Sequence, residues 1–219
     1  MKQIKRGHYK EDEFQNTMEK IAKYVVRHRE KSIFIGVSVV VVVVLAIFFL
    51  SRGEQANPKA DLMHTQALGM LTTGRIQDAQ AVLQELTRQY PNTRSGKIGF
   101  YYLGTLAYYA GRFEESLEHF DRFLSAEKND RLLTPSALMG AGGAAEGIKD
   151  YERALKYYEK VKRDEKSPLY AYGALSFGRV MGLLGRTEEA RKALQELLDN
   201  EPPSDVAADA RFYMGYFKK

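Results

Sequence analysis

The sequence predicts an all-α protein in which a single N-terminal transmembrane helix precedes an α-solenoid of about four helix pairs and a C-terminal capping helix. Three observations predict this fold: an uncharged apolar run near the N-terminus, helical periodicity after it, and helix-breaking turns at a nearly constant interval. The expected segments are a basic amphipathic tail over 1–32, a transmembrane helix over 33–51, a linker over 52–59 and a repeat domain over 60–219.

The composition argues against several kinds of chemistry. A chain of 219 residues holds one sizeable domain with a short segment beside it. Absence of cysteine excludes thiol catalysis, disulfides and zinc-thiolate sites. The four histidines, His8, His28, His64 and His119, stand in no metal-ligand spacing. We therefore expect no enzyme, no metal and no cofactor.

The basic charge is concentrated in the tail. Residues 1–32 carry nine basic and five acidic side chains, which leaves 24 basic against 23 acidic for the rest of the chain. A nucleic-acid-binding domain would carry its cationic face on the folded part. The charge distribution therefore argues against nucleic acid as a partner.

The run from Ile33 to Leu50 has the length of a membrane span. Its eighteen residues carry no charge, and Ser32 and Ser51 extend it to twenty, about 30 Å as a helix. A buried core helix and a cleaved signal peptide are the alternatives. The run is too uniformly apolar for a core helix in so small a chain, and too long and too far from the N-terminus for a signal. We expect an uncleaved anchor.

Basic residues predict the orientation of this anchor. Five of them crowd its N-terminal flank, whereas two follow in the first stretch beyond it; they are Lys20, Lys23, Arg27, Arg29 and Lys31 before, and Arg52 and Lys59 after. Basic flanks stay in the cytoplasm. The N-terminus is thus expected in the cytoplasm and the C-terminal domain, in a bacterium, in the periplasm.

Two weaker patterns lie around the span. An apolar stripe before it is typical of an interfacial helix, and it consists of Phe14, Met18, Ile21 and Val25. Ser32 and Gly36 form a small-xxx-small pair, which would let two such helices approach in a homodimer.

The rest of the chain is built on a repeat. Turn signals begin at Gly74, Gly111, Lys149 and Gly185, with spacings of 37, 38 and 36 residues. Small residues stand seven before and five after each turn; they are Ala67, Gly104, Gly142 and Gly178, then Ala79, Ser116, Ala154 and Ala190. Large apolar residues stand nine after, namely Leu83, Phe120, Tyr158 and Leu194. Small positions on both helices predict closely packed antiparallel pairs.

This pattern resembles the tetratricopeptide repeat, most closely in Leu103 to Leu124 and Tyr172 to Pro202. Lys149 departs from it at the turn glycine and Ser116 at the small alanine. After Pro203, Ser204 is expected to cap a final helix that covers the apolar face of the last repeat.

One motif imitates a nucleotide site. Gly140, Gly142 and Ala145 satisfy the GxGxxA form of a dinucleotide fingerprint, but no strand precedes them. They fall at packing positions of the third repeat, so we interpret them as structural. The acid pairs Glu114-Glu115 and Glu188-Glu189 are interpreted as helix-start charges.

The functional surface expected of such an array is the groove lined by the first helix of each pair. Its predicted protein-binding residues are Tyr101, Thr105, Tyr108, Met139, Leu175 and Arg179. This apolar and aromatic surface, with Arg179 as a lone cation, suits extended or partly unfolded polypeptide. The alternative is that Tyr101 and Met139 only pack against neighbouring helices.

The layout as a whole, with the span beginning KSIFIGVSVV, is similar to the ancillary Sec translocon subunit family of bacterial inner membranes. The resemblance implies association with the translocon and hand-over of exported polypeptides to periplasmic chaperones. Tyr90 to Leu124 also looks like repeats of cell-division coordinator and outer-membrane assembly lipoproteins. The alternative function is a structural scaffold for envelope assembly or cell division that binds no client.

Overall fold

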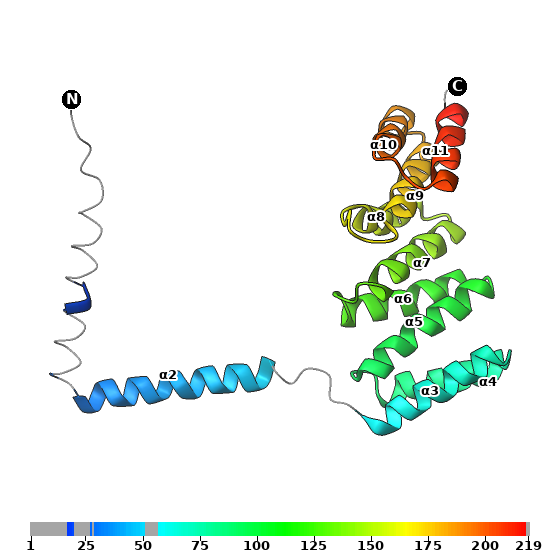
Figure 1. Ribbon diagram of the computed structural model, residues 1–219. Helices are drawn as coiled ribbons and strands as arrows, with labels where there is room; N and C mark the ends of the chain where they lie inside the picture. The colour runs from blue at the N-terminus through cyan, green and yellow to red at the C-terminus, as the bar shows by residue number, and fades with distance from the viewer. Residues whose placement is uncertain (1–16, 20–26, 28, 51–56, 218–219) are drawn as a thin grey trace, which may run out of the picture. The chain divides into compact units, whose positions relative to one another are not determined.

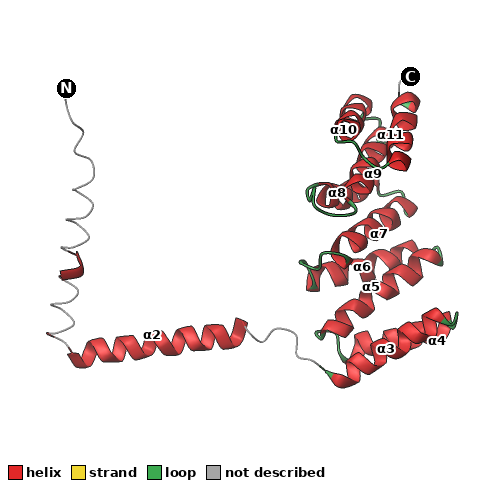
Figure 2. Cartoon of the chain, in the orientation of Figure 1, coloured by secondary structure: helices red, strands yellow, loops and turns green. Residues whose placement is uncertain are grey.

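The structure of the chain is a computed structural model that describes residues 17–19, 27, 29–50 and 57–217. These residues form helices joined by loops, and none of them lies in a strand (Figure 2). The chain divides into two compact units, Met1–Gly53 and Glu54–Lys219. Each unit is described by itself. The all-α class is confirmed.

The first unit contains helix α2, Arg29–Leu50, of 22 residues. Among the described residues, no helix is both long and apolar enough to cross a membrane, so the transmembrane helix predicted over 33–51 is not confirmed. Met18 of the predicted apolar stripe is half-exposed. Phe14, Ile21 and Val25 lie outside the described residues.

The second unit is a stack of helix pairs (Figure 1). The first helices of the pairs are α3 Pro58–Thr72, α5 Arg94–Tyr109, α7 Leu133–Gly147 and α9 Tyr170–Leu183. The second helices are α4 Ile76–Gln89, α6 Phe113–Ala126, α8 Tyr151–Lys162 and α10 Thr187–Asp199, and α11 Ser204–Tyr216 follows them. The predicted solenoid of four helix pairs and a capping helix is confirmed.

The four predicted turns have one backbone conformation. Gly74, Gly111 and Gly185 have φ of 75°, 73° and 78°, and Lys149 adopts the same left-handed region with φ 62°. Glycine is favoured there because it has no Cβ to clash with the backbone. The lysine at the third turn therefore keeps the geometry of the repeat although it departs from its sequence.

The small residues allow each first helix to lie against a large side chain of its partner. A Cβ added to Gly104 would lie 2.9 Å from the ring of Phe120. In the next two pairs, a Cβ added to Gly142 would lie 2.4 Å from the ring of Tyr158. A Cβ added to Gly178 would lie 2.7 Å from Leu194. These are the offsets that the sequence predicts, so the helix-pair register is confirmed.

Ser116 shows why a polar residue is tolerated at a small position. Its side chain is fully buried, and its hydroxyl donates a hydrogen bond of 2.8 Å to the carbonyl oxygen of Gly104. A buried hydroxyl is costly only when it lacks a partner. The serine thus links the two helices of its pair.

The helix ends depart from the sequence prediction at two places. Helix α3 begins at Pro58, two residues before the predicted domain start, because the Asn57 side chain accepts hydrogen bonds from Lys59 N and Ala60 N. At α11 the N-cap is Pro203, and Ser204 is the first helical residue without a capping bond. The predicted serine cap is therefore wrong.

Helix α11 covers the end of the last pair as expected. Its residues Val206 and Ala210 are buried in one cluster with Leu194 and Leu197 of α10. Each pair packs on its neighbours in the chain, and three apolar clusters run along the stack. Such nearest-neighbour packing is typical of a solenoid.

We expect Gly142→Ala to destabilise the protein. The new Cβ would overlap the buried Tyr158 ring, and overpacking of this kind costs about 1–3 kcal/mol. Gly69→Ala is the matched control, because Gly69 is also inside a helix but a Cβ there meets nothing within 4 Å. That substitution should stabilise by up to about 1 kcal/mol through helix propensity.

Thermal and urea unfolding of the two variants measure the difference. An equal change in both variants would show that helix propensity, rather than the close approach to Tyr158, sets the effect.

Candidate functional site

The residues predicted to line the groove all lie on first helices. Tyr101, Thr105 and Tyr108 come from α5, Met139 from α7, and Leu175 and Arg179 from α9. Five of them are partly buried, and Tyr108 is 36% exposed. They are therefore neither pure core nor free surface, and their contacts decide what each can offer to a ligand.

Tyr101 is largely committed to its own array. Its ring centroid lies 6.0 Å from that of Phe120 and 5.7 Å from that of Phe123, both on α6. The Thr105 hydroxyl donates to the Tyr101 carbonyl oxygen at 3.0 Å, one helical turn earlier. The hydroxyl of Thr105 thus finds its hydrogen-bond acceptor within α5.

Tyr108 bridges two repeats and leaves an edge open. Its ring packs edge-on against Phe113 at 5.6 Å. It also lies over Gly143 of α7, where a Cβ would come within 3.0 Å of the Tyr108 hydroxyl. The neighbouring Tyr109 is 83% exposed. Sequence reasoning missed Tyr109, although it directly follows a predicted groove position.

Met139 and Leu175 are half-buried apolar side chains on two different clusters. Met139 packs against the cluster that contains Phe120 and Phe123, and Leu175 against the cluster that contains Leu194. Both leave part of their surface uncovered. They could contribute apolar area to a bound chain without rearrangement.

The prediction that Arg179 is a lone cation is wrong. Its guanidinium donates two hydrogen bonds to the carboxylate of Glu146 on α7, at 2.6 and 2.7 Å. The Tyr158 hydroxyl donates to the same carboxylate at 2.6 Å. Arg179 and Glu146 are mostly buried, with side chains 24% and 16% exposed. The charge of Arg179 is therefore neutralised by an ion pair between repeats.

The protonation states in this cluster follow from its contacts. Burial, with the charge and hydrogen bond of Glu146, raises the pKa of Tyr158 well above its ordinary value. Burial opposes the charge of Arg179, but the hydrogen bonds and charge of Glu146 outweigh it and raise the pKa of Arg179. At neutral pH the Tyr158 phenol is therefore neutral and the Arg179 guanidinium is charged.

This pairing could not be found from single positions. Glu146 stands three residues before one turn and Arg179 six residues before the next. The same offsets bring Tyr108 over Gly143. Opposite charges at those two offsets in successive repeats could have predicted the ion pair. Using them requires knowing how one repeat stacks on the next.

Tyr157 and Arg153 form a second cluster between repeats, with Asp121. Arg153 and the Tyr157 hydroxyl both donate to the Asp121 carboxylate, at 2.5 Å. Burial and the bond to Asp121 raise the pKa of Tyr157 to about 12. All three polar groups are satisfied by one another, so this cluster also joins two repeats rather than binding a ligand.

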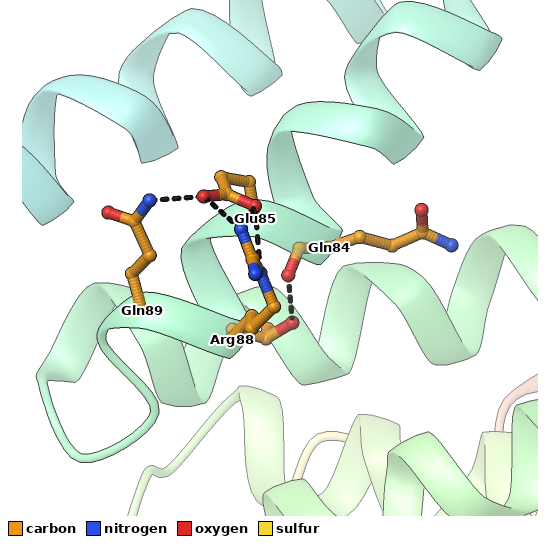
Figure 3. Close-up of polar contacts among 5 residues, drawn as sticks. Gln84, Glu85, Arg88 and Gln89 are labelled. Atoms are coloured by element: carbon orange, nitrogen blue, oxygen red, sulfur yellow. Dashed lines mark hydrogen bonds and ion pairs between the residues drawn. The ribbon is translucent and has the colours of Figure 1, made fainter.

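A surface cluster on α4 is likewise self-satisfied. Arg88 donates to both carboxylate oxygens of Glu85, and Gln89 donates to the same carboxylate (Figure 3). The hydrogen bond from Arg88 lowers the pKa of Glu85 despite its exposure. Residues three and four apart on a helix meet in this way without forming a site.

Two partly buried histidines carry buried ring nitrogens that have no hydrogen-bond partner. These are Nε2 of His64 and Nδ1 of His119. Burial lowers the pKa of both, against the opposing charges of Asp61 at His64 and of Glu115 at His119. Within the residues that the structure describes, no three His, Asp or Glu side chains gather as a metal ion would require.

The glycine motif of the third repeat is a packing surface. Gly140 faces the Phe120 ring and Gly142 the Tyr158 ring, and a Cβ at either would lie within 2.5 Å of ring atoms. Both are inside helix α7, and no strand leads into them among residues 57–217. The space that a phosphate would need is filled by aromatic side chains.

Helix pairs, left-handed turns and close glycine contacts together define an α-solenoid of stacked helix pairs. Models of the tetratricopeptide repeat match residues 101–168 and, separately, 61–93 and 174–204. These matches cover more than half of the chain and each of its helix pairs. The chain belongs to the tetratricopeptide-repeat family.

Solved structures share this fold. The 41-end fragment of MamA from Desulfovibrio magneticus RS-1 is 22% identical with a TM-score of 0.60, over 74% of this chain and 84% of that one. YrrB, a TPR protein with an unusual peptide-binding site, is 14% identical with a TM-score of 0.56, over 70% and 75%. PilW, a type IV pilus biogenesis factor, is 15% identical with a TM-score of 0.54, over 74% and 78%.

A search of curated proteins finds no match to this chain. At these identities the structural matches establish the fold alone.

We expect Arg179→Met to destabilise the protein strongly. The substitution leaves the Glu146 carboxylate buried without its cation, and breaking a buried pair costs about 3 kcal/mol or more. The double variant Glu146→Leu with Arg179→Met should recover most of that loss, because neither charge remains.

The control is Arg163→Met, which breaks the exposed pair with Glu159 and should cost less than about 1 kcal/mol. Urea unfolding of the four proteins gives the comparison. An Arg179→Met variant as stable as the control would mean that the buried pair contributes nothing.

Proposed function

We propose that this chain is a membrane-anchored periplasmic interaction module that associates with the Sec translocon and hands exported polypeptides to chaperones. In this proposal, residues 1–32 are a cytoplasmic tail, 33–51 the anchor and 52–59 the linker. The interaction domain follows, and its groove is lined by Tyr101, Thr105, Tyr108, Met139, Leu175 and neighbouring residues.

One observation carries the membrane part of the proposal. The apolar run lies within α2, and its described side chains, Phe34 and the unbroken series Val37–Ala46, are exposed around the helix. Consecutive helical residues point in all directions, so no single face could bury them against a protein core. Lipid would cover every face at once. No described helix qualifies as a span. The proposed anchor is supported by this exposure and by the basic residues that precede it in the sequence.

The interaction part rests on the repeat family. Tetratricopeptide arrays are scaffolds for protein contacts, and YrrB carries a peptide-binding site on this fold. Tyr108, Tyr109, Met139 and Leu175 offer partly uncovered aromatic and apolar surface. Such surface favours extended apolar segments, as exported chains present before they fold. The Sec association itself is supported by the layout of the chain.

A specific observation favours a second function. Tyr101 packs on Phe120 and Phe123, and Arg179 is held by Glu146, so much of the predicted groove is occupied by the array itself. A groove committed in this way suits a structural scaffold in envelope assembly or cell division, which binds no client.

Substituted cysteines test the topology. Because the chain has no native cysteine, Gln3→Cys and Glu188→Cys each place one thiol at a known position. In spheroplasts, a membrane-impermeant maleimide should label residue 188 directly and residue 3 only after permeabilisation. Equal labelling of both before permeabilisation would exclude the anchored arrangement.

Site-specific photocrosslinking in cells tests the groove. A photoreactive residue at Tyr109 or Met139 should give adducts with translocon subunits, chaperones or exported chains. Lys192 on the exposed side of α10 is the control position. Arg179 is avoided because its replacement breaks the buried ion pair. Adducts confined to Lys192 would leave the scaffold function as the better account.

A further inference from the structure

Two loops on one edge of the array enclose a pocket that the groove does not include. The loop between α6 and α7 supplies Lys128 to Arg131, and the region after α8 supplies Asp164 and Ser167. The pocket has a volume of about 620 Å³. It is built from successive repeats, so it exists only where they stack.

The floor of this pocket is apolar. Leu124, Leu138, Pro135 and Val161 line it, and Val161 and Leu138 are buried. Next to the rim, Leu132 is 67% exposed. An exposed leucine and an apolar floor both gain free energy when another apolar group covers them.

The rim of the pocket carries cations without carboxylate partners. Lys128, Arg131 and Lys160 line it and are exposed, and none of them forms an ion pair with a described residue. The Lys160 ammonium lies 5.8 Å from the Tyr157 ring centroid, a contact that leaves its charge unneutralised. Unpaired cations also occur elsewhere on the described surface, as at Lys192, but here three of them line one apolar pocket.

The two acidic residues of the pocket are bound to their own loops. Asp130 accepts hydrogen bonds from Leu132 N and Leu133 N at 2.9 and 2.8 Å, and these bonds lower its pKa. Asp164 accepts one from Lys166 N at 3.1 Å. Their carboxylates shape the loops and do not pair with the cations.

A second pocket, lined in large part by α6, shows the contrast. It is also lined by charged residues, but Glu118 pairs with Arg122 at 3.4 Å and Asp121 with Arg153 at 2.5 Å. Its basic side chains are neutralised within the molecule. Of these two pockets, the one between the loops has cationic charge available to a ligand.

We propose that the pocket between the loops is a docking site for an acidic segment of a partner protein that carries apolar side chains. The apolar side chains would fill the floor, and flanking carboxylates would pair with Lys128, Arg131 and Lys160. This site is distinct from the groove and does not depend on Sec association.

A peptide fits the pocket better than a membrane surface does. A lipid headgroup would meet the cations but leave the apolar floor empty, because acyl chains lie below the headgroups. The carboxylates of Asp130 and Asp164 would also face a continuous anionic plane, whereas a peptide can place its charges between them.

Fluorescence anisotropy with the full chain in a non-ionic detergent tests the proposal. The probe is a fluorescein-labelled peptide with two central leucines between two pairs of glutamates. We expect saturable binding that weakens as salt is raised and falls at least tenfold in Lys128→Glu with Arg131→Glu. Lys192→Glu with Arg211→Glu, exposed changes of equal total charge on α10 and α11, should bind like the unchanged chain.

Further arms separate the other outcomes. If the double variant fails to fold, the milder variant Lys160→Ala takes its place. It is checked by circular dichroism for intact helix and should also weaken binding. A peptide with lysines in place of the glutamates should not bind. Absent binding at millimolar peptide, or equal binding to the pocket variants, would overturn the proposal.

Flotation with phosphatidylglycerol vesicles tests the lipid alternative. If vesicles, and not the peptide, bound through Lys128 and Arg131, the pocket would be a membrane-facing surface and the proposal wrong. Crosslinks from Tyr109 and Met139 report on the groove separately, so failure of one site is distinguishable from failure of the other.

Discussion

The close approach between the two helices of each pair is the constraint on which the array depends. Gly104, Gly142 and Gly178 each accept a large side chain of the partner helix where any Cβ would overlap it. This contact fixes the distance and register of the pair, and the left-handed turn fixes its direction. Once the pair is rigid, its outer faces become surfaces on which the next pair can stack.

Polar contacts then set how one repeat lies on the next. Glu146 with Arg179, Asp121 with Arg153, and Glu152 with Arg186 each join residues 32 to 34 positions apart. Apolar clusters supply most of the stacking energy but are tolerant of small rotations. A directional ion pair with two hydrogen bonds is less tolerant. Charges held in these pairs serve the stacking of repeats, and only the charges left unpaired are available to partner proteins.

Sequence reasoning predicted what is local or periodic. The turns, including the one at Lys149, and the small positions follow from a period that a single chain displays. Ser204 was misjudged as a cap because the preceding Pro203 already occupies that position. Arg179 was misjudged as a free cation because its partner lies in another repeat. The pocket between the loops could not be predicted, since loop residues such as Lys128 and Asp164 keep no repeat register.

Lys149 holds a backbone conformation that its neighbours in the repeat assign to glycine. An L-residue in the left-handed region costs about 1 kcal/mol relative to glycine, and the exposed side chain shows no compensating bond in the described structure. The third repeat thus retains a strain that one substitution could relieve. Selection that acts only to keep a protein above a threshold of stability leaves such a residue in place. The turn stays closed through its own backbone hydrogen bonds, which Lys149 N donates to the Glu146 carbonyl oxygen and Asp150 N to the Ala145 carbonyl oxygen, both at 2.8 Å.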